Sequence, residues 1–238
     1  MEIKVIFDKN TDNNKLHIGW GISLLINNKI LFDTGEDGEW LLKNMESMNI
    51  DINGIESIII SHNHWDHTGG LTALLTARTK QVPVYICPGF SAELKELITQ
   101  KGGTPVETQQ WQEIKKNIYT TGEIPGIYKN AHLPEQSLVL RTPNGLSVIT
   151  GCAHPGILDI LSLVKEHFKE ENIFLVIGGF HLLEEDTRII DFIVREFKMM
   201  GVERVAPTHC SGSKTESIFA KEYRERSLTI KTGETIKI

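Results

Sequence analysis

Cysteine is scarce in this sequence, and the few that occur are scattered. Three cysteines, Cys87, Cys152 and Cys210, lie far apart among 238 residues. A disulfide framework needs more cysteines at closer spacing, and such frameworks belong to oxidising compartments. We therefore expect no disulfide scaffold and a reducing, cytoplasmic setting.

Long apolar runs and an excess of basic residues are also missing. Nowhere do about eighteen apolar residues follow one another, as a membrane-spanning helix requires, and the first residues lack the pattern of a secretion signal. The 25 lysines and arginines are outnumbered by 31 aspartates and glutamates, which gives a net charge of −6. Because this charge does not attract phosphate backbones, we expect no nucleic acid as partner. The missing apolar run likewise leads us to expect no membrane as partner.

The composition is otherwise that of an ordinary soluble globular protein. Hydrophobic residues make up 40% and charged residues 24%, and no low-complexity tract interrupts them. A length of 238 residues fits one large domain, so we expect residues 1–238 to form a single domain.

Apolar periodicity predicts alternating strands and helices through most of the chain. Strands are expected at 3–7, 21–26, 29–33, 55–61, 82–87, 137–142, 146–151, 173–179 and 204–209, and helices at 38–50, 70–78, 91–102, 157–170, 188–201 and 215–226. Residues 104–136 are typical of short strands with a long loop, and residues 227–238 alternate like a closing hairpin. Strands open each half and helices follow, which favours an α/β fold built as a four-layer αββα sandwich.

The segment SHNHWDHTGG, residues 61–70, places three histidines and an aspartate within six positions directly after an apolar strand. Imidazoles and carboxylates are ligands that zinc, iron and manganese accept. His62 and His64 project to one side of an extended segment and can hold one ion, while Asp66 and His67 follow a turn and point toward a second. A lone histidine is more often solvated or satisfied in a core. Four such groups at a strand end are costly to desolvate unless something holds them together, which favours a metal site.

This segment resembles the HxHxDH signature of the metallo-β-lactamase superfamily, including the strand before it and the glycines after it. The earlier phrase LFDTG, residues 31–35, resembles a second motif of the superfamily, which implies that Asp33 supports the metal site without binding the ion. The resemblance implies the αββα sandwich that the periodicity also favours. It further implies two divalent metal ions, with zinc as first choice and iron or manganese as alternatives.

Later phrases narrow the resemblance to one branch of the superfamily. GCAHPGI, GGFHL and THCSG, with PEQSLVL before them, are similar to the branch that contains the methanopterin-pathway synthase, which couples a dihydropterin diphosphate to a ribofuranosyl-aminobenzene phosphate. The resemblance implies that His209 is the last metal histidine. His154 and His181 also follow strand ends, where such a sandwich opens its active cleft. His167 lies in a helix among charged residues, so we expect it on a solvated face.

One position departs from the superfamily pattern. Most two-metal members carry a bridging aspartate where this chain has Cys152. A thiolate can ligate zinc or iron, but a small buried cysteine is the commoner finding and is the one we favour, as a support beside the ligands. His154 then completes the ion of His62 and His64. If Cys152 bridges instead, His132 competes as the third histidine.

These features predict an enzyme with a small-molecule substrate. The first hypothesis is a hydrolase in which two metal ions activate a hydroxide against a small phosphorylated or ester-like metabolite. Asp66 would hold an ion and orient the hydroxide, and His181 would donate to the developing oxyanion or to a substrate phosphate. Ser211 and Lys214 would add an anion cradle after His209, although an ordinary polar loop explains them equally well.

Two alternatives stay open. A transferase like the synthase of this branch would bind a departing diphosphate at the metals and use an organic nucleophile in place of water. A non-enzymatic or redox di-iron module ranks last, because related di-iron proteins usually carry a fused flavin domain, and 238 residues show no such segment.

Overall fold

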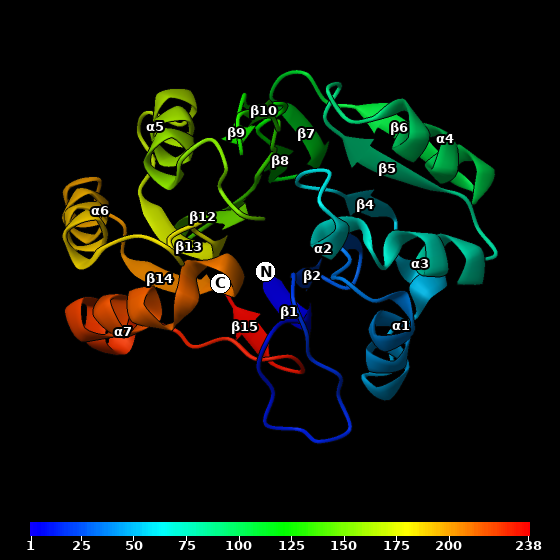
Figure 1. The fold of residues 1–238 in the computed structure, drawn as a ribbon, viewed down its shortest axis with the longest axis horizontal. Helices are drawn as coiled ribbons and strands as arrows, with labels where there is room; N and C mark the ends of the chain where they lie inside the picture. Colours follow the sequence, from blue (N-terminus) through cyan, green and yellow to red (C-terminus); the bar gives the residue numbers. More distant parts are fainter. The chain divides into compact units, whose positions relative to one another are not determined.

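The computed structural model describes residues 1–238, which divide into two units, each a β-sheet with its own helices (Figure 1). The first unit comprises Met1–Gln109 together with Ile230–Ile238, and the second comprises Gln110–Thr229. No helix in either unit is both long enough and apolar enough to cross a lipid bilayer. Whether the two units act as one domain stays a prediction.

The first unit is built on a seven-stranded sheet in the order β15-β1-β2-β3-β4-β5-β6. Its strands are β1 (Glu2–Phe7), β2 (Ser23–Ile26), β3 (Ile30–Phe32), β4 (Ser57–Ile59), β5 (Val82–Ile86), β6 (Gly103–Glu107) and β15 (Thr235–Lys237). The strands from β15 to β3 pair antiparallel, whereas those from β3 to β6 are parallel. Phe32 lies opposite Ile59, so the carboxyl ends of β3 and β4 are neighbours.

Short helices flank this sheet and close the core of the first unit (Figure 1). They are α1 (Gly38–Ser47), the 3-10 turn η1 (Ile52–Gly54), α2 (Trp65–Thr68), α3 (Leu71–Ala77) and α4 (Ala92–Gln100). Leu41 of α1 and Leu74 of α3 pack in one fully buried cluster with Ile58 of the sheet. The hydroxyl of Ser91 accepts a hydrogen bond from the amide of Leu94 and so caps the amino end of α4.

The second unit has a six-stranded sheet in the order β14-β13-β12-β11-β8-β7 and a separate two-stranded hairpin. The sheet strands are β7 (Gln112–Lys115), β8 (Ile118–Thr120), β11 (Leu138–Thr142), β12 (Gly145–Thr150), β13 (Ile173–Gly179) and β14 (Arg204–Thr208), and the hairpin strands are β9 (Ile127–Tyr128) and β10 (Ala131–His132). β12, β13 and β14 are parallel, with Thr150 opposite Gly178 and Gly179 opposite Thr208. Their carboxyl ends therefore lie side by side.

Three helices cover this second sheet. They are α5 (Ile157–His167), α6 (Thr187–Met199) and α7 (Gly212–Tyr223), and the short turns η2 (His209–Ser211) and η3 (Arg224–Arg226) flank α7. Each helix presents an apolar stripe with three- and four-residue spacing, and the stripes meet the strands in one buried cluster. Phe180, Phe197 and Phe219 form its aromatic centre, with ring centroids 5.3–5.6 Å apart.

Most predicted elements lie where the periodicity indicated, and the mixed α/β class is confirmed. The predicted closing hairpin at 227–238 is wrong. Only Thr235–Lys237 forms a strand there, and it pairs antiparallel with β1, where Ile236 lies opposite Ile3. Alternation of apolar residues indicates an extended segment but carries no information about its partner, and a distant strand provides the hydrogen bonds here.

Candidate metal centre

The first cluster of metal-competent side chains lies at the carboxyl ends of β3 and β4. Nε2 of His62 is 3.1 Å from Nδ1 of His64, and the rings of His62 and His67 are 4.1 Å apart. Two imidazole nitrogens on a tetrahedral zinc ion lie about 3.3 Å apart, because each is about 2 Å from the metal. The spacing of His62 and His64 therefore fits a shared ion.

A second donor pair follows on α2. Oδ2 of Asp66 lies 3.5 Å from Nε2 of His67, and both residues are buried. The carbonyl of His64 accepts hydrogen bonds from the amides of His67 and Thr68, which begin the helical turn. This turn places Asp66 and His67 on α2, directly after the extended residues that carry His62 and His64.

A buried carboxylate fixes the imidazoles from behind. Oδ2 of Asp33 accepts hydrogen bonds from Nδ1 of His67 at 2.6 Å and from the hydroxyl of Ser61 at 2.7 Å, while Oδ1 accepts from the amide of Ser61. The Ser61 hydroxyl lies 2.9 Å from Nδ1 of His62, so Nδ1 of His62 donates to it. Both imidazoles then carry their proton on Nδ1, which leaves Nε2 as the ligand atom.

The glycines after the motif have a steric cause. A Cβ atom at Gly69 would lie 2.1 Å from the carbonyl oxygen of Glu36, and one at Gly70 would lie 2.3 Å from that of Thr34. No side chain fits at these distances, so only glycine lets the segment between α2 and α3 pass this close to the chain after β3.

The second cluster lies at the carboxyl ends of β12, β13 and β14 in the second unit. The ligand atoms of Cys152, His154 and His181 all lie within 4.8 Å of one another, and Sγ of Cys152 is 3.3 Å from Nε2 of His209. A sulfur and a nitrogen on one tetrahedral zinc ion lie about 3.5 Å apart, given a zinc–sulfur bond of about 2.3 Å. This cluster also fits a metal ion.

Backbone strain marks the same positions. Ala153, His181 and His209 have φ values of 62°, 55° and 50°, in the left-handed region that non-glycine residues rarely adopt. Such conformations persist where the surrounding structure enforces them, often at functional sites. Here they turn the chain sharply after each of the three strands.

Sequence reasoning missed Cys210, which links the residues of the second cluster. Burial raises the pKa of the Cys210 thiol, but hydrogen bonds from Cys152 and His181 outweigh it and hold that pKa well below its ordinary value. The hydrogen bond with Cys210 in turn raises the pKa of His181, and burial of the ring opposes this only in part. His181 is thereby favoured as an imidazolium.

Sequence reasoning also missed Glu135 and Tyr128. The carboxylate of Glu135 accepts hydrogen bonds from the four successive amides of residues 151–154. The ring of Tyr128 packs edge-on against the imidazoles of His154 and His181, at centroid distances of 5.1 and 5.8 Å. The phrase PEQSLVL contains Glu135, but nothing in the sequence assigned it a role.

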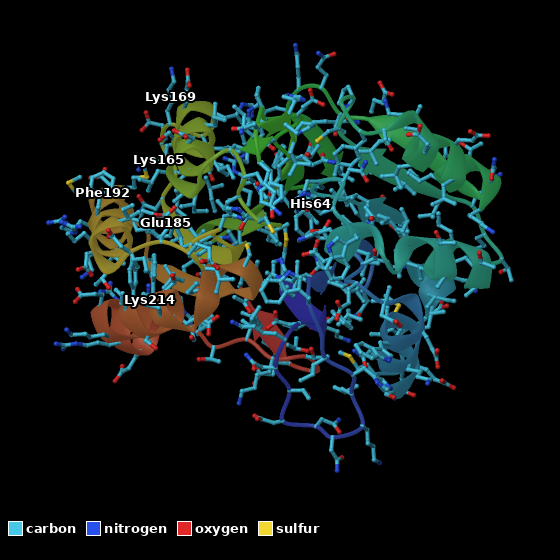
Figure 2. The ribbon with its side chains drawn as sticks, viewed as in Figure 1. His64, Lys165, Lys169, Glu185, Phe192 and Lys214 are labelled. Atoms are coloured by element: carbon cyan, nitrogen blue, oxygen red, sulfur yellow. The ribbon has the colours of Figure 1, made fainter.

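Other predicted residues lie elsewhere. The hydroxyl of Ser211 is buried and accepts a hydrogen bond from the amide of Phe180, and the ammonium of Lys214 on α7 donates to the carbonyl of Glu185 (Figure 2). The structure thus gives both groups partners within the fold, and their substrate role stays a prediction. His132 is exposed on β10.

His167, in contrast, lies where the sequence indicated. It is exposed near the end of α5, and its ring stacks on Trp111 with centroids 4.1 Å apart. This histidine belongs to neither cluster.

Comparison with known proteins assigns this architecture. Residues 28–127 match the family model of the β-lactamase superfamily domain. A solved structure, described as a metal-dependent hydrolase of the β-lactamase superfamily, is 31% identical, with a TM-score of 0.84 over 100% of this chain and 99% of that one. The chain belongs to the metallo-β-lactamase superfamily and has its mixed α/β fold with two sheets. Members of this superfamily typically bind metal ions, in keeping with the donor clusters.

Two proteins of Methanocaldococcus jannaschii are similar along most of the chain. One, named 7,8-dihydropterin-6-methyl-4-(β-D-ribofuranosyl)-aminobenzene-5'-phosphate synthase, is 34% identical and aligns with 89% of this chain and 85% of its own length. The other is an uncharacterized protein, 28% identical over 89% of this chain and 91% of its own length.

Proposed function

We propose that this protein is a metal-dependent transferase that joins a dihydropterin diphosphate to the amine of a ribofuranosyl-aminobenzene phosphate and releases diphosphate. The similarity to the synthase of Methanocaldococcus jannaschii carries the proposal, because the two sequences are 34% identical over 89% of this chain and 85% of the synthase. The first hypothesis from the sequence, a hydrolase, becomes the second candidate.

The proposed centre holds two metal ions. His62, His64, Asp66 and His67 would bind metal in the first unit, and His154 and His209 would bind metal in the second. The donor spacing within each cluster supports this assignment. Zinc suits the mixture of imidazole and carboxylate donors beside a thiol, and iron or manganese is the alternative. Cys152 binds no ion in this proposal and packs beside the ligands, with Sγ 3.3 Å from Nε2 of His209.

The reaction we propose exchanges one bond for another. A carbon–nitrogen bond forms between the methylene group of the pterin and the aryl amine, the carbon–oxygen bond to diphosphate breaks, and the amine loses a proton. Bound metal ions supply positive charge that stabilises the departing diphosphate. His181, favoured as an imidazolium by Cys210, donates a hydrogen bond to a phosphoryl oxygen of the leaving group. The carboxylate of Asp66 accepts the amine proton.

Product stoichiometry tests the proposal. Metal-loaded protein is incubated with the pterin diphosphate, with and without the aryl amine, while diphosphate and pterin products are quantified. Transfer predicts one coupled product for each diphosphate, and no turnover without the amine. Hydroxymethylpterin formed at the same rate without the amine would refute transfer.

Two histidine variants extend this test. His181→Gln is expected to slow turnover and leave the product ratio unchanged, because a hydrogen-bond donor to the leaving group is weakened. His167→Gln is the matched control, since that imidazole stacks on Trp111 near the end of α5. Equal losses in both variants would contradict the role of His181.

A hydrolase remains the second candidate because a solved structure 31% identical to this chain is described as a metal-dependent hydrolase. A screen of phosphodiesters, pyrophosphates and lactones addresses it. Turnover of any of these substrates well above that of the coupling reaction would favour hydrolysis. In either case we propose a small-molecule substrate and a cytoplasmic setting, which the three buried cysteines, none of them in a disulfide, support.

A further inference from the structure

The carboxylate of Glu135 accepts hydrogen bonds from the backbone amides of the segment that follows β12. Oε1 accepts hydrogen bonds from the amides of Gly151, Cys152 and Ala153 at 3.1, 3.0 and 2.9 Å, and Oε2 accepts from the amide of His154 at 2.8 Å. The side chain of Glu135 is fully buried. Four successive amides therefore converge on one negative charge away from water.

The backbone of Glu135 is itself held in place. Its amide donates to the carbonyl of Ile124 at 3.0 Å, and its carbonyl accepts from the amide of Ile124 at 2.9 Å. This pair of hydrogen bonds forms an isolated β-bridge outside the main sheet. The carboxylate thus projects from a fixed point.

The carbonyl groups of the same segment are satisfied by other partners. The amide of Gly179 donates to the carbonyl of Gly151 at 3.1 Å, and the amide of Gly156 donates to that of Ala153 at 2.9 Å. Sγ of Cys210 lies 3.6 Å from the carbonyl oxygen of Cys152. Because buried backbone groups need partners, Glu135 supplies the acceptors that a neighbouring strand would supply inside a sheet.

We propose that Glu135 is a positioning residue for the metal centre and acts through Cys152 and His154. Its carboxylate holds the segment in the strained turn at Ala153, where φ is 62°, and so fixes the direction of both side chains. Its buried negative charge, which accepts from the amide of His154, also favours a cation bound by that residue. Groups behind the ligands commonly change metal affinity by about 10–100-fold. This inference rests on the metal centre of the proposed function and is independent of the substrate.

The test replaces Glu135 with glutamine, which has the same length but no charge and turns a donor toward some of the amides. In metal-free Glu135→Gln protein, the amides of residues 151–154 are expected to exchange hydrogen at least about tenfold faster than in the wild type. The dissociation constant for Zn²⁺ or Co²⁺, measured by competition with a chelator, is expected to rise by about 10–100-fold. Glu135→Asp keeps the charge on a shorter side chain and should recover part of both losses.

A control separates positioning from general stability. Ile190→Ala removes a fully buried side chain on α6 and should lower the melting temperature without selective exchange at 151–154. The inference would be overturned if Glu135→Gln kept the wild-type rate of amide exchange at 151–154 and the wild-type metal affinity. It would also be overturned if Ile190→Ala, with a melting temperature equal to that of Glu135→Gln, lost as much metal affinity. If Glu135→Gln does not fold, wild-type exchange at 151–154 in Glu135→Asp overturns it. A wild type that binds metal but forms no coupled product refutes the transferase proposal alone.

Discussion

Replacing Asp33 with asparagine should weaken metal binding through the proton position on His67. Asp33 is fully buried and accepts from Nδ1 of His67 at 2.6 Å and from the hydroxyl and amide of Ser61 at 2.7 Å each. Asparagine keeps one acceptor oxygen, which the amide of Ser61 engages, and turns its NH₂ group toward the imidazole. His67 then carries its proton on Nε2, where a metal cannot bind.

The size of this effect follows from the lost contact. A hydrogen bond to a charged group contributes about 1.5–3 kcal/mol, and each 1.4 kcal/mol is about a factor of ten. We therefore expect the dissociation constant for Zn²⁺ to rise by about 10–100-fold. Asp33 has a φ of 56°, and asparagine tolerates this left-handed conformation, so backbone strain adds nothing.

Chelator competition measures the affinity, and nitrogen chemical shifts of the His67 ring report its tautomer in metal-free protein. Asp37→Asn is the matched control in the same unit, because asparagine caps α1 as well as the aspartate does. Wild-type affinity in Asp33→Asn, with His67 still protonated on Nδ1, would refute the reasoning. Equal weakening in Asp37→Asn would refute it too.

Three further predictions concern stability, measured by denaturant titration of metal-free protein. The hydroxyl of Tyr223 is buried without a hydrogen-bond partner, so Tyr223→Phe should stabilise the fold by about 1 kcal/mol, and a destabilised variant would show an overlooked partner. Burial raises the pKa of Tyr223 from 10.0 to about 12. The free energy of unfolding should therefore be unaffected by this group below pH 10.0 and should fall as the pH rises toward about 12. A phenylalanine variant with the same alkaline decline would contradict this. Gly178→Ala would place a Cβ atom 2.1 Å from the carbonyl oxygen of Thr150 and should prevent folding or lower the stability by more than about 3 kcal/mol. In Gly102→Ala the added Cβ atom meets open space, and the stability should fall by about 1 kcal/mol. Similar losses in the two variants would contradict the steric argument.

The first cluster could be predicted from the sequence because its geometry is local. His62, His64, Asp66 and His67 lie within one strand end and one helical turn, so their spacing already determines which side chains meet. Asp33 is more distant in sequence, but β3 and β4 are parallel neighbours, and their carboxyl ends bring it to the motif.

The supports of the second cluster could not be predicted, because they act through groups that leave no pattern. Glu135 binds backbone amides, which every residue has, and it lies where the apolar periodicity is weakest. The low pKa of Cys210 arises only where Cys152 and His181 meet it, after two separate strands have ended. The prediction of a closing hairpin at 227–238 failed for the same reason, since the strand that pairs with β15 is β1, at the other end of the chain.

Metal content is the most direct test of the central claim, that histidines of both clusters hold metal ions. Protein purified without chelator and analysed by mass spectrometry for metals should contain two transition-metal ions per chain. His64→Ala and His154→Ala should each reduce this number, while His167→Ala should not. A wild type that contains no metal after supplementation with zinc, iron and manganese, or full occupancy in both His64→Ala and His154→Ala, would contradict the account.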